Sequence, residues 1–170
     1  RRSGITLVLV AWILGSASGL SAADVNHDLK DFQLDDFRGR TWSLEDFDDK
    51  QLLVVTFLGT ECPLVKLYAR SLNAMADRFE RDGVAFVGID SNQQDSLAEI
   101  AHFAKTHEIG FPILKDAGNR LAEQLDAERT PEIFVFDAER RVRYRGRIDD
   151  KYTYGIQRPK ATQEYLLAAI

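Results

Sequence analysis

Cysteine is nearly absent from this sequence, since Cys62 is the only one among 170 residues. An intramolecular disulfide needs two cysteines, so any disulfide of this chain is transient or joins it to another molecule, and the fold depends on its core alone. Metal-ligand patterns are missing as well. His27, His102 and His107 have no partner at the spacing of a metal site, and we expect none of them to bind a metal.

The sequence also lacks internal repeats, a glycine-rich phosphate loop and an excess of basic residues. Lys and Arg number 22 against 27 Asp and Glu, which gives a formal net charge of −5 at pH 7. Phosphate backbones repel an acidic protein, so we expect no nucleic acid partner. Without a phosphate loop we expect no nucleotide, and no other residue pattern calls for a cofactor.

No apolar run is long enough to cross a bilayer comfortably, which takes about 20 residues. Arg1 and Arg2 precede an apolar run from Ile5 to Leu14, and small residues follow through Ala23. This order predicts a secretory signal peptide over residues 1–23, cleaved after Ala23, and hence an exported, periplasmic or extracytoplasmic protein. The alternative is an uncleaved membrane anchor, which would be the chain's one contact with a membrane.

The remaining residues, 24–170, are enough for one domain with a proper core and too few for two ordinary domains. The sequence begins with Arg rather than Met, and its last apolar pattern is still running at Ile170. We therefore expect the natural chain to extend beyond these ends.

What the sequence does contain is an apolar run, Leu52 to Leu58, followed at once by the start of a helix. Uninterrupted apolar and β-branched residues are typical of a strand covered on both faces. Gly59 to Glu61 form the turn, Cys62 is at the expected N-cap and Pro63 takes the first helical position, where its missing N–H costs nothing.

A helix N-terminus gathers unpaired N–H groups and partial positive charge, which favour a thiolate at Cys62. Lys66, one turn into the helix, should add to this effect, and Glu61 should oppose it. The alternative is a buried structural cysteine, a common fate of a lone thiol.

The residues after Cys62 predict a strand–helix–strand unit. Leu64, Tyr68, Leu72, Met75 and Phe79 recur at helical spacing and should form one stripe against the sheet. The helix should stop at Gly83, and residues 84–89 should form a second buried strand parallel to the first. The fold class is therefore α/β.

A polar loop, residues 90–95, leaves the carboxyl end of this second strand on the side where Cys62 leaves its own. It is either a solvated connection or part of a binding crevice. Ser96 and Glu99 have capping-box spacing for a further helix, whose buried face should include Leu97 and Ile100.

Three further elements are expected at the two ends of the domain. Alternating residues around Arg38 and Gly39 predict an N-terminal β-hairpin between Phe32 and Phe47. Thr130 and Pro131 head a buried strand through Asp137, with an antiparallel partner over residues 142–148. Pro159 should open a final helix.

The antiparallel partner strand carries an arginine on every second residue, so all four should share one face: Arg141, Arg143, Arg145 and Arg147. This row is either an anion-binding stripe or a solvated face on an outer strand.

Taken together, residues 57–65, 88–92, 130–137 and 144–150 resemble the thioredoxin-fold redoxin group, related to alkyl hydroperoxide reductase/thiol-specific antioxidant proteins and to exported thioredoxin-like reductases. The resemblance implies a central mixed β-sheet flanked by helices, with the N-terminal hairpin as an extension. It also implies that Pro131 is a cis-proline lying against the thiol, and that Thr130 offers backbone hydrogen bonds to a bound thiol or peptide.

Two departures from the family pattern bear on the reaction. Thioredoxin-type reductases have a second cysteine where this chain has Val65, so Cys62 cannot resolve its own mixed disulfide. Peroxiredoxins place a threonine three residues before the cysteine and an arginine at the position of Pro131. Here Gly59 and Thr60 stand three and two residues before Cys62, and Arg129 or the arginine row would have to replace the missing arginine.

The sequence thus predicts a thiol-dependent oxidoreductase in which Cys62 attacks a disulfide or a hydroperoxide and an external thiol or a thiol–disulfide partner protein resolves the product. The predicted site comprises Cys62 as the catalytic residue, with substrate contacts from Thr60, Pro63, Arg129, Thr130 and Pro131. The alternative is a non-catalytic thioredoxin-fold module that binds, or exchanges electrons with, a partner within a larger exported protein.

Overall fold

A computed structural model describes residues 28–153 and 155–170. The expected signal peptide and cleavage position, together with His27, lie outside these residues. Within the described ranges, no helix is long and apolar enough to cross a membrane.

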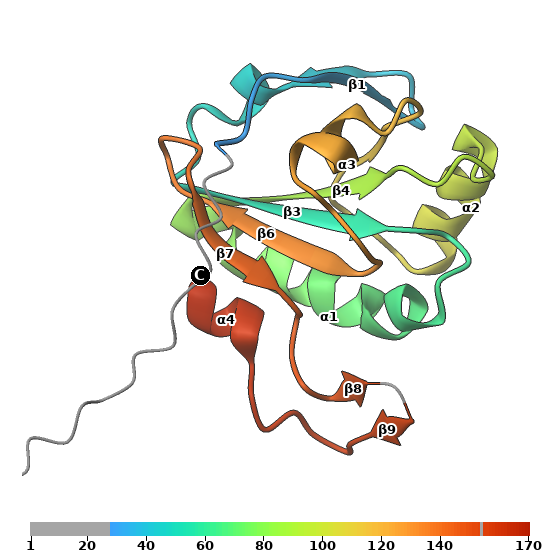
Figure 1. The fold of residues 1–170 in the computed structure, drawn as a ribbon, viewed down its shortest axis with the longest axis vertical. Helices are drawn as coiled ribbons and strands as arrows, with labels where there is room; N and C mark the ends of the chain where they lie inside the picture. The colour runs from blue at the N-terminus through green and yellow to red at the C-terminus, as the bar shows by residue number, and fades with distance from the viewer. Residues whose placement is uncertain (1–27, 154) are drawn as a thin grey trace, which may run out of the picture.

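The apolar run after Gln51 forms β3, an interior strand of a seven-stranded sheet (Figure 1). The strands of this sheet are β1 (Gln33–Asp36), β2 (Thr41–Ser43), β3 (Leu52–Leu58), β4 (Val84–Asp90), β5 (Ile113–Lys115), β6 (Glu132–Phe136) and β7 (Val142–Gly146). They lie in the order β2-β1-β5-β4-β3-β6-β7. β3, β4 and β5 are parallel, whereas β1, β6 and β7 each run antiparallel to a neighbour. The mixed sheet and the N-terminal hairpin are thus confirmed.

The helical elements lie in the connections between these strands, except for the last, which follows β7. They are η1 (Leu44–Phe47), α1 (Pro63–Phe79), η2 (Glu80–Asp82), α2 (Leu97–Thr106), α3 (Arg120–Gln124) and α4 (Tyr165–Ala169). A separate two-stranded hairpin, β8 (Tyr152–Thr153) and β9 (Ile156–Gln157), precedes α4 and projects below α1 in Figure 1.

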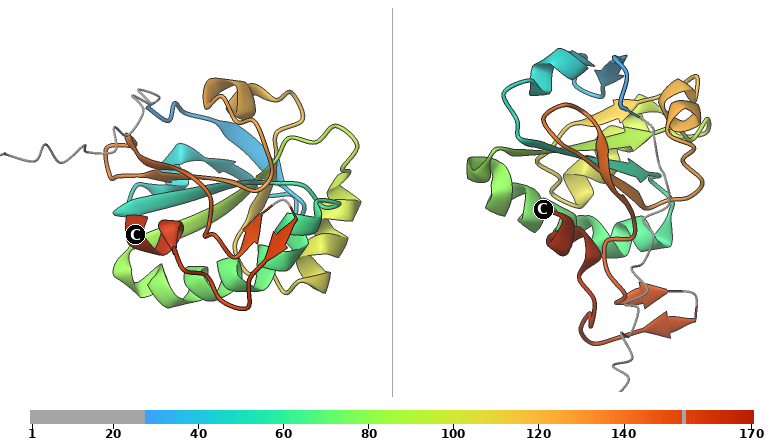
Figure 2. Two further views of the ribbon diagram at one scale, coloured as in Figure 1. Left: turned by 60° about the horizontal axis from the view of Figure 1, so that its bottom comes forward. Right: turned by 60° about the vertical axis from the view of Figure 1, so that its left-hand side comes forward.

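Alternation along the strands divides the core between the two faces of the sheet. On one face, α1, α2 and α4 cover a helix-side core that includes Val54, Tyr68, Leu72, Phe86, Phe103, Ile133, Ile148 and Leu166. On the other face, α3 and the N-terminal segment cover a hairpin-side core that includes Phe32, Phe47, Leu53, Val55, Ile89, Leu121, Phe134 and Phe136. Figures 1 and 2 show α1 and α4 on the opposite side of the sheet from α3.

Three details of the helices differ from the sequence-based expectation. Val65 and Ala69 are buried in α1 beside Tyr68 and Leu72, so the buried stripe is rotated and Leu64 lies at its half-buried edge. Leu97 is 44% exposed, and the buried face of α2 consists of Ile100, Phe103 and Ala104.

The last helix begins at Tyr165 and not near Pro159. The Asp150 carboxylate accepts the backbone N–H groups of Thr162 (2.7 Å) and Gln163 (3.0 Å). These bonds hold the intervening backbone in a loop, so the helix starts only after them.

Candidate active site

Cys62 is the N-cap residue of α1, and Pro63 occupies the first turn as expected. The turn before it is closed by a hydrogen bond from the Cys62 N–H to the Gly59 carbonyl (3.1 Å), and the helix begins with one from the Lys66 N–H to the Cys62 carbonyl (3.1 Å). The thiol is partly buried and packs against the helix-side core. It is therefore neither fully sealed nor freely exposed.

The Cys62 thiol donates a hydrogen bond to the carbonyl oxygen of Thr130, with 3.2 Å between Sγ and O. The Thr130–Pro131 peptide bond is cis and leads directly into β6. Cys62 is 68 residues from Thr130 in sequence, yet it meets the Thr130–Pro131 pair at the carboxyl end of β3, as the resemblance implied.

The turn before Cys62 is anchored to the loop that follows β4. The Thr60 N–H donates to Asp95 Oδ2 (2.9 Å), and Asn92 Nδ2 donates to the same oxygen (3.1 Å). Gly59 is in close contact with this loop, because a Cβ placed there would lie 2.1 Å from Asn92 Nδ2. Loop 90–95 therefore packs against the cysteine turn and is not merely a solvated connection.

Two buried carboxyl groups lie within this loop, Asp90 and Asp95. Burial raises the pKa of Asp90 to about 7, with Asp95 adding to the rise and the Lys115 ammonium group, 2.9 Å from Asp90 Oδ1, opposing it. Burial acts in the same direction on Asp95, but the hydrogen bonds from Thr60 and Asn92 outweigh it and lower the pKa of Asp95. Sequence reasoning placed the loop near the thiol and missed these burials.

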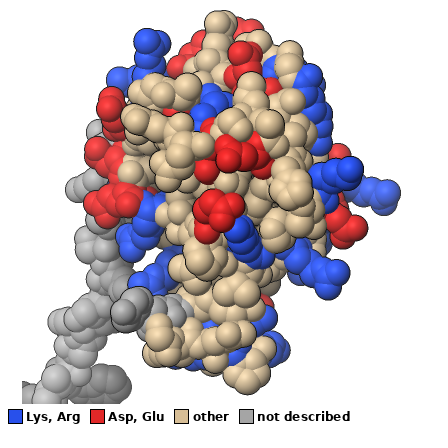
Figure 3. All heavy atoms as spheres, turned by 90° about the vertical axis from the view of Figure 1, so that its right-hand side faces the viewer, with Lys and Arg blue, Asp and Glu red and all other residues tan. Residues whose placement is uncertain are grey.

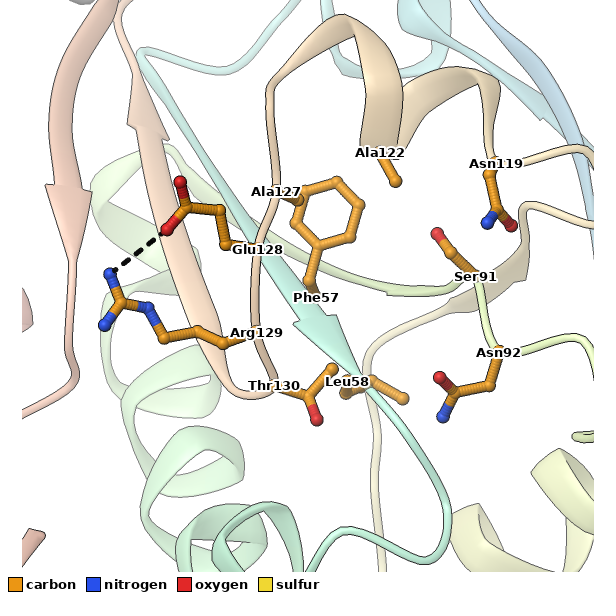
Figure 4. A pocket seen from close by; sticks show the side chains of 10 residues that line it. All are labelled: Phe57, Leu58, Ser91, Asn92, Asn119, Ala122, Ala127, Glu128, Arg129 and Thr130. Carbon is orange, nitrogen blue, oxygen red and sulfur yellow. Dashed lines mark ion pairs between the residues drawn. The ribbon is translucent and has the colours of Figure 1, made fainter. Parts of the chain in front are cut away.

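Two hollows meet at Thr130, whose carbonyl holds the thiol. The first, of about 330 Å³, lies between the ends of β3 and β4 and the segment before β6; it is lined by Phe57, Leu58, Ser91, Asn92, Asn119, Ala122, Ala127, Glu128, Arg129 and Thr130 (Figure 4). The second, of about 190 Å³, is the cis-proline groove; it is lined by Leu64, Tyr68, Arg129, Thr130, Pro131, Arg147, Ile148, Asp149 and Tyr152.

Tyr68 connects α1 to the far wall of the cis-proline groove. Its hydroxyl donates to Asp149 Oδ1 and accepts the Tyr152 N–H (3.3 Å), and its ring packs edge-on against that of Tyr152, with centroids 5.0 Å apart. Burial and the hydrogen bond to Asp149 raise the pKa of Tyr68. Its hydroxyl is thus a fixed donor at neutral pH.

The arginines and Lys66 are less closely associated with the thiol than the sequence suggested. In Figure 4 the Arg129 side chain points towards Glu128, and its guanidinium lies 4.0 Å from both Glu128 and Glu132. Lys66 forms an ion pair with Glu61 (3.0 Å). Each of these cations is thus partly neutralised by a nearby carboxylate.

The arginine row is not uniformly solvated. Arg145 is only 21% exposed and forms an ion pair with the buried Glu132 (2.9 Å), whereas Arg141 and Arg143 lie beside Asp137 at the surface. Arg140, which sequence reasoning did not single out, is buried in the turn before β7 with a left-handed backbone (φ 62°).

No group of three or more His, Cys, Asp or Glu side chains arranged to hold a metal occurs in the described part of the chain. The two described histidines, His102 and His107, lie on or just past α2, and the His107 ring packs against Phe103.

Comparison with solved structures identifies chains of the same fold. A protein of Sinorhizobium meliloti, SMc02350, is 34% identical with a TM-score of 0.72, and the match covers 75% of this chain and 73% of that one. Peroxidoxin BcpB from Mycobacterium tuberculosis is 23% identical with a TM-score of 0.63, over 72% of this chain and 84% of that one. The thioredoxin-like fold is therefore confirmed.

Sequence comparison finds a curated relative and a family. Chloroplastic peroxiredoxin Q of Sedum lineare is 29% identical over 93 residues, which are 55% of this chain and 48% of the relative, so the chain matches about half of that protein's length. The family model of AhpC/TSA matches residues 25–145. The lone thiol at the start of α1, the cis-proline beside it and this match over most of the sequence lead to one conclusion: the chain belongs to the AhpC/TSA family of redoxin and peroxiredoxin-like thiol oxidoreductases.

Proposed function

We propose that Cys62 is the nucleophile of a one-cysteine thiol oxidoreductase. The observation that carries this proposal is the hydrogen bond from the thiol to the Thr130 carbonyl. This bond holds a partly exposed sulfur at the N-terminus of α1, beside a residue that lines both hollows.

With a disulfide as substrate, the Cys62 thiolate attacks one sulfur, the S–S bond breaks and a thiolate leaves. The resulting mixed disulfide joins Cys62 to the substrate. Because Val65 stands one turn further along α1 and is buried, the resolving thiol comes from outside the chain. Its attack on the mixed disulfide forms a new disulfide and releases the Cys62 thiolate.

With a hydroperoxide as substrate, the thiolate attacks the terminal oxygen, the O–O bond breaks, and water or an alcohol leaves with a proton. The sulfenic acid at Cys62 is then reduced by two external thiols, with loss of water. We favour the disulfide as the oxidant. Position 59 carries no side chain to activate a peroxide, and the Arg129 guanidinium is directed to Glu128 and Glu132.

The remaining site residues take supporting roles in this scheme. The cis-proline groove binds the segment next to the substrate sulfur, with Thr130 and Pro131 against the reacting atoms. Pro63 and Thr60 fix the turn that presents the thiol, and Arg129 lies at the shared rim of both hollows, where it meets anionic groups of the substrate. The reductant is an external thiol or a partner protein in an extracytoplasmic compartment, to which the expected signal peptide at residues 1–23 would direct the chain. Residues 24–170 form the domain that carries out the reaction.

Intact-mass measurement tests the proposal. The protein is incubated with oxidised glutathione and, separately, with hydrogen peroxide in the presence of dimedone, which traps sulfenic acid. We expect rapid gain of one glutathione on Cys62 and slower formation of the dimedone adduct, and neither in Cys62→Ser. A Cys62 that reacts with both reagents no faster than a free peptide thiol would contradict an enzymatic role and leave a thioredoxin-fold binding module as the function.

A further inference from the structure

One carboxyl oxygen of Asp90 is buried and has no hydrogen-bond donor among the described residues. The residue is fully buried at the end of β4. Its Oδ1 accepts hydrogen bonds from Lys115 Nζ (2.9 Å) and from the Asn92 N–H (3.1 Å). Its Oδ2 has no donor among the described residues. A buried acceptor without a donor is costly and calls for an explanation.

The explanation lies in Asp95, which Asn92 holds beside Asp90: the Asn92 N–H donates to Asp90 Oδ1 (3.1 Å) and the Asn92 side-chain amide donates to Asp95 Oδ2 (3.1 Å). Besides the effect of burial, a hydrogen bond between the two carboxyl groups raises the pKa of Asp90 and lowers that of Asp95. Two carboxylates are acceptors only, and two neighbouring buried negative charges repel each other strongly. The contact is favourable only when one proton lies between the two groups. With that proton, the pair carries a single negative charge, which Lys115 balances.

We propose that Asp90 and Asp95 share one proton, and that this proton keeps loop 90–95 closed on the turn that positions Cys62. Asp90 is the donor, because its other oxygen is already occupied by Lys115 and Asn92, and Asp95 is the acceptor. Asp90 and Asp95 are positioning residues in this proposal, since neither touches the reacting sulfur.

The connection from the shared proton to the thiol is short. The same Asp95 oxygen, Oδ2, accepts the Thr60 N–H (2.9 Å) and the Asn92 amide (3.1 Å), and Asn92 packs directly against Gly59. Thr60 is two residues before Cys62. When Asp90 loses its proton, Asp95 is repelled from it, so the bonds that fix Gly59 and Thr60 weaken and a second negative charge is left near the thiolate.

The surrounding charges modify this equilibrium without replacing it. Lys115 comes from β5 and stabilises the ionised form of Asp90. Asp116, the residue after β5, accepts hydrogen bonds from the Ser91 hydroxyl (3.0 Å) and from N–H groups in the first turn of α3. Glu99, in the first turn of α2, is bound to Ser96. Of these three groups, Lys115 is the one that directly contacts the pair.

The consequence for the reaction rests on the proposed function of Cys62. Burial already places the Asp90 pKa near neutrality, at about 7, so the proton is present below that pH and lost above it. The thiolate of Cys62 should thus be best positioned and most reactive while Asp90 is protonated, and a further rise in pH should improve its reactivity less than thiol ionisation alone would.

The proposal is tested by measuring the titration of the Asp90 carboxyl group directly. In the whole protein, the ¹³C carboxyl shifts of Asp90 and Asp95, the exchange rate of the Thr60 amide and the rate of Cys62 alkylation are measured across pH. We expect Asp90 to titrate near neutrality and Thr60 exchange to accelerate through the same pH, beyond the ordinary base dependence. Lys115→Met should move the Asp90 midpoint upward, because it removes the compensating cation.

Asp90→Asn mimics the protonated form, since its amide can donate to Asp95. In this variant the extra step in Thr60 exchange should vanish, and above the wild-type transition Cys62 alkylation should be about three- to tenfold faster, the factor that corresponds to half to one pH unit. Asp82→Asn, which removes an exposed charge from η2, is the matched control and should behave as wild type.

A wild-type Asp90 that titrates with exposed aspartates, or Thr60 exchange unchanged in Asp90→Asn, would overturn the shared proton. The carboxyl titration and the amide exchange need no turnover, and in the wild-type protein they need no variant. They therefore decide this proposal even if Cys62 fails as an enzyme nucleophile, and a failed shared proton leaves the reactions of Cys62 with glutathione disulfide and peroxide to be judged separately.

Discussion

At the scale of single residues, Gly59 is constrained by what lies against it. The Asn92 side chain occupies the space of a Cβ, at 2.1 Å from its ideal position. The threonine that peroxiredoxins carry at this position would need Asn92, and with it the Asp95 hydrogen bond, to move. The glycine is thus matched to the loop after β4.

Gly59→Ala should therefore lower the free energy of unfolding by about 1–3 kcal/mol, the usual cost of overpacking, and slow Cys62 alkylation at neutral pH. Urea denaturation and alkylation kinetics measure the two effects. Gly118→Ala is the control, because a Cβ there would be at least 3.7 Å from its neighbours. Equal stability of the two variants would show that Asn92 yields easily.

Several site residues could be predicted from the sequence because local rules place them. Proline after an N-cap cysteine marks the helix start, and a Thr-Pro strand head marks the residue against it. The Asp90–Asp95 contact could not be predicted, because it depends on how loop 90–95 folds back in three dimensions. Arg129 was assigned to the site by sequence proximity to Pro131, and its preference for Glu128 and Glu132 was not visible in one dimension.

At the scale of elements, the ion pair between Glu132 and Arg145 joins β6 to β7. The sequence shows only a row of arginines and does not indicate which of them makes this pair. Glu132 is buried at the first residue of β6, where it bonds Arg145 Nε (2.9 Å) and the Glu128 N–H (2.8 Å). The Arg145 guanidinium also lies over the Phe134 ring, 5.2 Å from its centroid. This pair links the strand after Pro131 to the edge of the sheet.

Arg145→Met should cost about 3 kcal/mol in the free energy of unfolding, because it leaves the buried Glu132 carboxylate without its closer cation and only Arg129, 4.0 Å away, beside it. Arg143→Met, two residues along the same strand, removes a side chain that is 62% exposed and should cost less than about 1 kcal/mol. Chemical denaturation of both variants compares them directly. Similar losses would mean that the buried carboxylate is stabilised mainly by its backbone donor.

Tyr68 ties α1 to the segment after β7, so its hydroxyl should shape the cis-proline groove. Tyr68→Phe leaves Asp149 and the Tyr152 N–H short of a partner and should cost about 1–2 kcal/mol. It should also weaken glutathione disulfide exchange at Cys62, since the groove wall loosens. Tyr152→Phe keeps the ring contact and serves as control. Thermal unfolding and intact-mass kinetics would show whether the two variants differ.

The strands and most helices could be predicted from local sequence patterns. The predictions that were wrong concern places where tertiary contacts override the local pattern. Continuous apolar runs identified β3, β4 and β6, and Ser96 with Glu99 identified the start of α2. The late start of α4 depends on a carboxylate at Asp150 that captures backbone N–H groups beyond ten residues along the chain. The periodicity of apolar residues gives no indication of these hydrogen bonds, so the start of α4 could not be predicted from the sequence.

At the scale of the whole molecule, charge is distributed rather than gathered. Figure 3 shows Lys and Arg side chains interspersed with Asp and Glu over the face that lies to the right in Figure 1. With a formal net charge of −5, this pattern gives no continuous basic surface on that face. We therefore expect this face not to attract a polyanion over long distances.

The dependence of global stability on pH should carry the signature of Asp90. Its folded pKa, about 7, is above the ordinary value of 3.8, so the folded state binds the extra proton between these limits. The contribution is complete below about pH 4 and is lost as pH rises to about 7, at up to about 1.4 kcal/mol per pH unit.

Urea denaturation across this range should show that slope in the wild type and a flatter dependence in Asp90→Asn. Carboxylates with lowered pKa act in the opposite sense. Those of Asp95 and Asp150, the latter lowered to about 2 chiefly by the Thr162 hydroxyl, contribute stability above their ordinary values that is lost in stronger acid. A wild-type stability that rises from about pH 5 to 7 would contradict the assignment to Asp90.

The order in which the parts of the cis-proline groove occur along the chain has a consequence for synthesis. Cys62 and Tyr68 are translated early, whereas Pro131, Ile148 and Tyr152, which complete the groove, come much later, and Leu166 seals the core beneath only near Ile170. A nascent chain therefore carries its sulfur without the groove until Tyr152 and Leu166 have been synthesised. Before that point the sulfur is open to oxidants, and selectivity is acquired only when these residues take their places.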